Sequence, residues 1–272
     1  MAAPAASATR PRLAGLWSHP GLRELEHNLL AFRRDWQSYL LSGLSQPFLY
    51  LMSLGIGLGL YVDRASGTPG GVPYLVYVAP ALIVTQAMMV ASFESAWPIM
   101  SKFMWSKTYL AALNTPLGVV DLLAGDLLWI AFRLTFLSCL FFVPIVVLGA
   151  VVSPLAVLAI PVAVLTGLAF AAPIMAFTAT QRREGGFNVL FRFGITPLFL
   201  FSGTFFPIEK LPLFLQPLAW ATPLFHGVAL ARSLSLGRVE PVENLIHLGF
   251  LAAVVAAGAA AGRIAYRRRL SV

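Results

Sequence analysis

The sequence predicts an all-α polytopic membrane protein with six transmembrane helices. Of its 272 residues, 58% are hydrophobic and only 11% are charged, against roughly a quarter charged in an ordinary soluble domain. Several uncharged runs reach about 20 residues, the length of helix that crosses ~30 Å of hydrocarbon. A soluble α/β domain, in which apolar faces alternate with charged ones, is therefore excluded.

Hydropathy and turn residues place the six spans and divide the chain into two parts. The first span contains Gly55 and Gly59, and the last contains Gly258 and Gly262, a spacing of small residues that permits close helix contact. We expect a cytoplasmic N-terminal segment over 1–36 and a transmembrane domain with a short basic tail over 37–272. The six spans cover about 38–61, 76–97, 117–148, 154–180, 187–203 and 243–265.

The N-terminal segment predicts an amphipathic helix on the cytoplasmic membrane surface. Residues 1–20 contain no apolar core of signal-peptide length, so we expect the N-terminus to be retained. Beyond Pro20, apolar residues recur at three- and four-residue steps with charged residues between them. The apolar positions are Leu22, Leu25, Leu29, Phe32 and Trp36, and the charged ones are Arg23, Glu24, Arg33 and Arg34.

The basic residues predict the orientation. With the N-terminus inside, thirteen Lys and Arg residues fall on the cytoplasmic side, and four fall outside: Arg64, Lys210, Arg232 and Arg238. This asymmetry is the signal that orients membrane proteins, so it also explains the net charge of +8 without a nucleic-acid partner. We therefore expect a multi-pass protein of the cytoplasmic (inner) membrane with both termini in the cytoplasm.

The segment between the fifth and sixth spans is apolar but carries prolines at 207, 212, 217 and 223. Proline removes a backbone donor and clashes with the preceding turn, so these positions forbid one continuous helix. Irregular backbone at membrane depth is tolerated where protein or a water-filled cavity satisfies it. The pattern predicts an extracellular re-entrant helical hairpin.

The sequence carries no recognisable catalytic or metal-binding motif. No GxxxxGK[ST] phosphate loop surrounds any of the three lysines, and no nucleophile elbow occurs. The four histidines have neither an i,i+4 pair nor an acidic partner at ligand spacing, which argues against a metal site, and His226 is interpreted as a polar tip. We expect no cofactor on this chain and no enzymatic activity of its own.

Three charged residues are candidates for function within the membrane: Glu94, Asp126 and Arg133. Charge at membrane depth is costly and is a functional candidate by default. Glu94 and Asp126 also fall near the cytoplasmic ends of their spans, where structural pairing or solvation explains them equally well. Arg133 lies about 10 Å further along its helix than Asp126, so it requires a buried partner or an aqueous cavity.

The motif "SGTFFPIEKLP" (202–212), followed by "PLAWATPLFHG" (217–227), resembles the type-2 ABC exporter permeases. The likeness is to the subfamily of nodulation-type lipo-oligosaccharide exporters and daunorubicin-type drug exporters, and it covers about residues 22–270. It implies a homodimer or heterodimer of permease chains that works with two copies of a separate ATPase, which binds ATP and Mg. The implied function is export of an amphipathic, lipid-linked or drug-like substrate.

The resemblance also implies two sites. The loop over 101–116 would correspond to a coupling helix that contacts the ATPase, through Phe103, Met104, Trp105, Tyr109 and Leu110; the alternative is a loop that lies on lipid headgroups. Residues 180–186 would form a shorter contact, although their Arg pair is equally well explained by positive-inside anchoring. The proline-broken segment corresponds to re-entrant helices at the exit. Its aromatic residues Phe201, Phe205, Phe206 and Trp220 are candidates for an exit gate or substrate path, although aromatic residues at this level also serve as interfacial anchors.

Two functions from other classes remain open from the residues alone. A membrane-embedded transferase would need a polar catalytic cluster at one interface, and a secondary transporter would need inverted repeats with ionisable groups near the midplane. Neither feature is visible in the sequence. Lipid is a further expected partner, and the composition does not identify the cargo.

Overall fold

The computed structural model describes residues 29, 32–33, 37, 48–65 and 71–270, and within these ranges every regular element is a helix. Four stretches of this part are long and apolar enough to cross a membrane. They are α3 (Tyr74–Met104), α5 (Val119–Val147), Pro154–Thr180 with α6 (Ala159–Thr180) as its main part, and α11 (Pro241–Leu270). They match the second, third, fourth and sixth expected spans, so an all-helical polytopic membrane protein is confirmed.

The other two expected spans are shorter or lie partly outside the described residues. The first covers residues 38–47, which are not described, and continues as a π-helical segment, Leu51–Leu58, and α2 (Gly59–Ala65). The fifth is built from α7 (Gly185–Val189), a π-helical turn over Leu190–Ile195, and α8 (Thr196–Phe201). Its 17 residues extend about 25 Å, short of a ~30 Å hydrocarbon core. The count of six spans stays a prediction.

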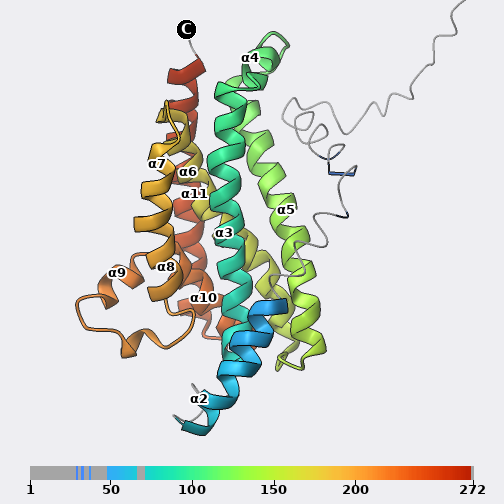
Figure 1. The fold of residues 1–272 in the computed structure, drawn as a ribbon, viewed down its shortest axis with the longest axis vertical. Coiled ribbons are helices and arrows are strands. Elements are labelled where there is room, and N and C mark those ends of the chain that lie inside the picture. The colour runs from blue at the N-terminus through green and yellow to red at the C-terminus, as the bar shows by residue number, and fades with distance from the viewer. Residues whose placement is uncertain (1–28, 30–31, 34–36, 38–47, 66–70, 271–272) are drawn as a thin grey trace, which may run out of the picture.

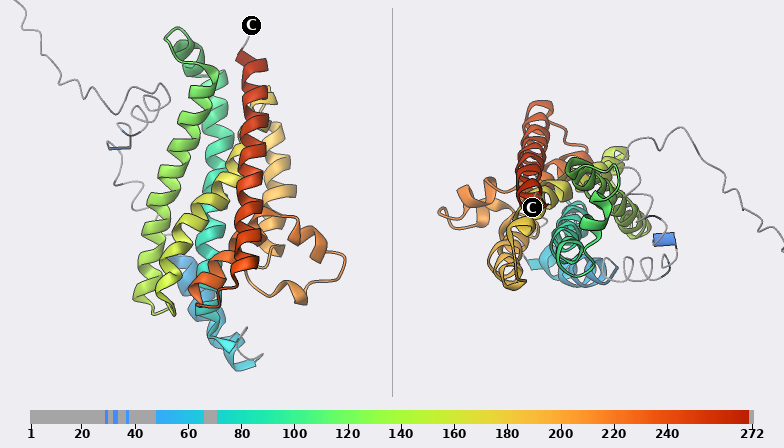
Figure 2. Two further views of the ribbon diagram at one scale, coloured as in Figure 1. Left: turned by 180° about the vertical axis from the view of Figure 1, so that it is seen from behind. Right: turned by 90° about the horizontal axis from the view of Figure 1, so that it is seen from above.

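The long helices run between two ends of the molecule that differ in character. Figure 1 shows α4 (Thr108–Leu113) and the C-terminus at one end, and α2 and α9 (Gln216–Trp220) at the other. We call the end with α4 and the C-terminus the basic end, because Lys107, Arg182 and Arg267–Arg269 belong to it. The opposite end is called the far end. In the view from above, α3 lies between α5 and the α7–α8 stretch (Figure 2).

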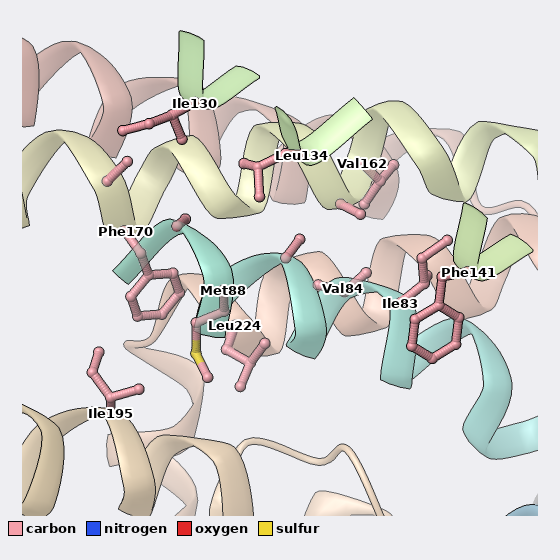
Figure 3. Close-up of a cluster of buried hydrophobic side chains, with 14 of the residues drawn as sticks. Ile83, Val84, Met88, Ile130, Leu134, Phe141, Val162, Phe170, Ile195 and Leu224 are labelled. Atoms are coloured by element: carbon pink, nitrogen blue, oxygen red, sulfur yellow. The ribbon is translucent and has the colours of Figure 1, made fainter. Parts of the chain in front are cut away.

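The core is formed where α3, α5, α6 and α10 (Pro223–Ser235) meet. Figure 3 shows Met88 of α3 close to Leu224 of α10, with the apolar side chains of α5 and α6 above them. The labelled core residues are Ile83, Val84, Met88, Ile130, Leu134, Phe141, Val162, Phe170, Ile195 and Leu224. Tight apolar packing of this kind orders helices that lipid alone would not drive together.

Glycines allow the helix backbones to approach closely. A Cβ atom on Gly258 of α11 would lie 2.6 Å from Pro173 Cδ and 2.9 Å from the Ala172 carbonyl carbon of α6, and one on Gly262 would contact Leu123 of α5. Gly55 similarly packs against Leu75. The small-residue patterns of the first and last spans are therefore used for contacts inside the chain.

The proline-rich segment contains an irregular loop followed by a largely buried 13-residue helix, α10. The loop carries only a three-residue helical turn, Ile208–Lys210, and the short α9, whereas α10 begins at Pro223 behind the N-cap of Thr222. Here prolines stand at helix starts, where the missing donor costs nothing. The first limb of the expected hairpin is thus largely non-helical, and a re-entrant hairpin stays a prediction.

α10 packs deep between the long helices. Gly227 lies against Thr166 of α6 and Val84 of α3, where a side chain would not fit. Val84 lies about 15 Å along α3 from its start at the far end. After α10, a turn at Gly237, with a φ of 69° that favours glycine, returns the chain to α11.

The expected amphipathic helix over 22–36 lies mostly outside the described residues. Among those described, Phe32 packs edge-on against three aromatic rings of α5. The distances between ring centroids are 5.1 Å to Phe136, 5.7 Å to Phe132 and 6.2 Å to Trp129. This contact brings the N-terminal segment to α5.

Candidate functional site

The basic end contains a buried polar cluster centred on Asp126 of α5. The Asp126 carboxylate is 1% exposed and accepts hydrogen bonds from Lys102 Nζ of α3, at 2.6 Å, and from the Tyr109 hydroxyl of α4. A carboxylate in apolar surroundings is costly unless it is paired and hydrogen-bonded in this way. The contacts join the ends of α3 and α5 to α4, and they give Asp126 a structural role.

Three aromatic rings enclose the cluster. The ring centroid of Phe103 lies 4.7 Å from that of Tyr109 and 5.0 Å from that of Tyr266 of α11, and the two tyrosine oxygens are 3.4 Å apart. Edge-on aromatic pairs contribute more to stability than the burial of their apolar area alone. The rings therefore stabilise the contact of α4 with the ends of α3 and α11. The end of α11 is thus attached to the same cluster as α4. We call Lys102, Phe103, Tyr109, Asp126 and Tyr266 the Asp126 cluster.

Arg269, near the end of α11, connects the Asp126 cluster to α6. Its guanidinium lies 4.3 Å from the ring centroid of Phe103 and donates hydrogen bonds to the carbonyl oxygens of Thr178, at 3.0 Å, Ala179, at 3.1 Å, and Gln181. Carbonyls in the last turn of a helix lack their full set of intrahelical donors, although that of Thr178 also accepts from the Gln181 N–H at 3.1 Å. A cation there also complements the helix dipole. All four long helices therefore meet at this end.

Tyr109 remains a neutral hydrogen-bond donor. Burial raises the pKa of its hydroxyl well above the ordinary value, and the nearby negative charge of Asp126 raises the pKa further. A neutral hydroxyl beside a carboxylate donates to it. The Tyr109 hydroxyl therefore stays protonated and donates to Asp126.

The five residues expected to couple to an ATPase divide into two groups. Met104, Trp105 and Leu110 are exposed, with 61% of Trp105 accessible, whereas Phe103 is partly buried and Tyr109 is 1% exposed. The loop is not one amphipathic helix, because α3 ends at Met104 and the backbone turns at Lys107, whose φ is 50°. Tyr109 faces inward as a result and cannot touch a partner directly.

Glu94 of α3 and Arg133 of α5 form an ion pair inside the helix bundle. Arg133 Nη1 and Glu94 Oε1 are 2.6 Å apart, and the side chains are 20% and 7% exposed. The deep arginine therefore has the buried partner that its position required. A charge pair of this kind fixes the two helices relative to one another and needs no contact with substrate.

A groove of about 690 Å³ lies at the far end between α3, the loop after α8, α10 and α11. Arg232 of α10 lies in it, 3.8 Å from the ring centroid of Tyr77, and donates hydrogen bonds to the carbonyl oxygens of Tyr77, Gly203 and Thr204 at 3.1–3.3 Å. The groove thus has a fixed positive charge beside aromatic surface. Glu209 and Glu243 also line it.

Two histidines pair in the wall of this groove. The Nδ1 atoms of His226 and His247 are 2.7 Å apart, and His226 Nε2 is 3.0 Å from the Trp220 carbonyl oxygen. A ring nitrogen facing a carbonyl must donate, so Nδ1 of a neutral His226 accepts and His247 donates. Within the described ranges, no group of three or more His, Cys, Asp or Glu side chains could hold a metal ion.

In the described part of the chain, the four gate candidates lie in different surroundings. Trp220 lines the far-end groove, and Phe201 lines a separate cavity of about 360 Å³. Phe205 lines neither cavity, and its carbonyl oxygen accepts a hydrogen bond of 3.2 Å from the Tyr74 hydroxyl. Phe206 packs on the small apolar cluster of the loop. A common gate would therefore require a second chain, and the assignment stays a prediction.

Several of these contacts could not be found from sequence spacing. Tyr266 and Arg269 lie more than 150 residues from Tyr109 and Phe103, and Arg267–Arg269 read only as an orientation signal. The sequence places Arg232 among the outer basic residues, and the spacing of His226 and His247 gives no sign that they pair. Only the return of the chain from α10 to α11 brings the two histidines together.

The sequence matches the family model of the ABC-2 type transporter over residues 25–236. The match covers most of the chain and includes α3 to α10. The chain therefore belongs to the ABC-2 type transporter family. It is a membrane subunit of an ABC transporter, a class whose ATPase activity is carried by a partner.

The curated relatives specify the subfamily. The chain is 32% identical over 244 residues to Nodulation protein J of Rhizobium leguminosarum bv. viciae, covering 89% of this chain and 92% of the relative. It is 33% identical over 225 residues to Nodulation protein J of Rhizobium leguminosarum bv. trifolii, covering 82% and 84%. Nodulation protein J of Rhizobium meliloti is 31% identical over 222 residues. The chain is thus an ABC-2 type permease of the nodulation subfamily.

Proposed function

We propose that this chain is the permease subunit of an ATP-driven exporter that moves an amphipathic, lipid-linked or drug-like substrate outward across the cytoplasmic membrane. The observation that carries the proposal is the exposed apolar set of Met104, Trp105 and Leu110, held at the basic end by the Asp126 cluster. Exposed apolar surface of this kind marks a contact with a protein or a membrane, and the resemblance to coupling helices supports a protein. That partner would be the ATPase.

The proposed orientation places the basic end in the cytoplasm. Lys102, Lys107, Arg182, Arg183 and Arg267–Arg269 would then follow the positive-inside rule, and both termini would be cytoplasmic. Six crossings satisfy this arrangement if α7–α8 forms the fifth span and residues 38–61 form the first. The far-end groove and the proline-rich loop would then open outside.

The proposed assembly contains two permease chains, identical or homologous, and two ATPase chains. ATP and Mg would be bound by the ATPases, because this chain has no phosphate loop in its sequence. The segment over 1–36 would contact the inner lipid surface, while 37–272 would form the transmembrane domain. Phe201, Phe205, Phe206 and Trp220 would come together around the exit only in the dimer.

The Asp126 cluster supplies a path for coupling in this proposal. A displacement of Trp105 or Leu110 would be transmitted through Tyr109 to α5 and α11, because a hydrogen bond and packed aromatic rings join these elements. Tyr109 and Phe103 would therefore act as positioning residues. Substitutions at the exposed Trp105 would test contact with the ATPase, and substitutions at the buried Tyr109 would test transmission to α5 and α11.

Copurification with the ATPase tests the proposal. A tagged wild-type chain, extracted from its native membrane, should bring down a chain with a phosphate-binding loop. Trp105→Ala should reduce the recovered ATPase at least tenfold, since a large aromatic anchor in an interface commonly contributes 2 kcal/mol or more. Phe214→Ala is a matched control, because Phe214 is also exposed but lies in the far-end loop. Equal recovery from all three chains would refute the assigned contact.

A further inference from the structure

A further cavity lies at the basic end, between the end of α6 and the last turns of α11. Its volume is about 400 Å³. One part of its lining is strongly basic, and another part is apolar and belongs to α11. The basic residues are Arg182, Arg268 and Arg269, and the apolar ones include Ala261, Ile264 and Ala265.

The cavity gathers positive charge without an acidic side chain in its lining. The charges of Arg182 and Arg269 lie close enough to repel each other. The Lys102–Asp126 and Glu94–Arg133 ion pairs lie elsewhere in the fold. An anion in the cavity would relieve this repulsion.

The guanidinium of Arg269 is held in a fixed position at one side of the cavity. Its hydrogen bonds to the carbonyl oxygens of Thr178, Ala179 and Gln181 hold the guanidinium at the end of α6. Arg182 follows this helix end directly, and Arg268 precedes Arg269 on α11, and both of these side chains are exposed. Two exposed guanidinium groups therefore flank a fixed third one.

The apolar part of the lining distinguishes between kinds of anion. Ala261 and Ala265 are small and leave room along α11, and Ile264 is 54% exposed beside them. A small inorganic anion would contact only the guanidinium groups. A lipid with an acidic head group would use both parts, with its phosphate at the arginines and an acyl chain along the helix.

We infer that this cavity binds an anionic phospholipid of the leaflet at the basic end, with the phosphate between Arg182 and Arg268 and one acyl chain along Ala261, Ile264 and Ala265. The lipid would seal the contact between α6 and α11 next to the Asp126 cluster. It would thereby stabilise the end of the molecule at which we propose the ATPase docks. In the view from above, α11 lies at the edge of the bundle (Figure 2), and Ala261, Ile264 and Arg268 on it are exposed, so lipid can reach this side of the helix.

Lipid binding to the purified wild-type complex tests the inference without any transported substrate. Phosphatidylglycerol should raise the thermal midpoint in detergent, whereas phosphatidylcholine and inorganic phosphate at matched concentration should not. Native mass spectrometry should detect retained phosphatidylglycerol. If inorganic phosphate stabilises the complex as well as phosphatidylglycerol does, the site binds an anion only, and the inference is wrong.

Paired variants locate the site. The double variant Arg182→Gln with Arg268→Gln should weaken phosphatidylglycerol binding about 30-fold. Each arginine near an anionic lipid surface strengthens binding about five- to sixfold, and the two factors multiply. Arg183→Gln with Arg263→Gln removes the same charge outside the cavity and should retain most of the binding. An equal loss in both double variants would mean a diffuse charge effect. If the Arg182→Gln, Arg268→Gln variant loses the ATPase while its lipid binding is unchanged, the cavity is a contact with a protein. Each of these two results would overturn the inference.

Discussion

Removal of the Tyr109 hydroxyl is the sharpest perturbation of the Asp126 cluster. In Tyr109→Phe the ring keeps its packing against Phe103 and Tyr266, while Asp126 loses the hydrogen bond from the Tyr109 hydroxyl. The ion pair with Lys102 remains. The substitution therefore removes the bond between α4 and α5 together with the longer contact to the Tyr266 hydroxyl, and Tyr266→Phe removes that longer contact alone.

The structure sets the size of the expected effect. A hydrogen bond to a charged group contributes about 1.5–3 kcal/mol, and a buried carboxylate oxygen left without a donor adds to the cost. Tyr266→Phe is a matched control, because it removes a hydroxyl from the same cluster whose oxygen lies 3.4 Å from that of Tyr109. A longer bond between neutral groups contributes about 0.5–1 kcal/mol. Tyr109→Phe should therefore destabilise the protein about two- to threefold more than Tyr266→Phe.

Two assays read this difference. Thermal unfolding in detergent should show a larger fall in midpoint for Tyr109→Phe than for Tyr266→Phe. In the reconstituted complex, Tyr109→Phe should keep its bound ATPase, since Tyr109 is buried, but should lower the transport achieved for each ATP hydrolysed. An equal or larger effect of Tyr266→Phe on stability would refute the central place of the Tyr109–Asp126 bond.

Three further predictions test other parts of the structure. Glu94→Gln leaves Arg133 without its carboxylate and should lower the free energy of unfolding by about 3–5 kcal/mol, whereas Glu94→Gln with Arg133→Gln should recover part of the loss in a thermal unfolding assay. Gly258→Ala places a Cβ atom 2.6 Å from Pro173 Cδ and should lower the thermal midpoint, while Gly249→Ala, where nothing lies within 4 Å, should not; equal midpoints would contradict the close packing of α6 and α11. In a Cys139→Ser background, single cysteines at Thr68 and Lys210 should react with an impermeant reagent from outside, and those at Lys107 and Arg183 should not; the reverse pattern would overturn the orientation.

The sequence predicted the long helices well because each has a continuous apolar run. The expected span over 154–180 coincides with the helical stretch Pro154–Thr180, and that over 117–148 differs from α5 by one or two residues at each end. The expected span over 76–97 is shorter than α3, because α3 continues through Lys102 to Met104 beyond the apolar core. Hydropathy detects the membrane-embedded part of a helix, and it does not detect where the helix ends.

The candidate site was predicted only in part, because its contacts join distant parts of the chain. The pattern over 101–116 indicates apolar surface at Trp105, whose side chain is exposed, but it does not show that the turn at Lys107 places Tyr109 inside. Glu94, Asp126 and Arg133 were identified by their depth alone, and only the packing of α3 against α5 shows which partner each one has. The sequence gives no such indication of depth for Arg232, because its charge falls among those of the outer loops.

ATP hydrolysis by the purified proteins tests the central claim most directly, namely that this chain is a permease driven by a separate ATPase. The measurement compares this chain alone, the ATPase alone and the two together in lipid vesicles. We expect no hydrolysis by this chain alone and a rate for the assembled complex that depends on Trp105. Hydrolysis by this chain alone, or an ATPase whose rate is the same with and without it, would contradict the account.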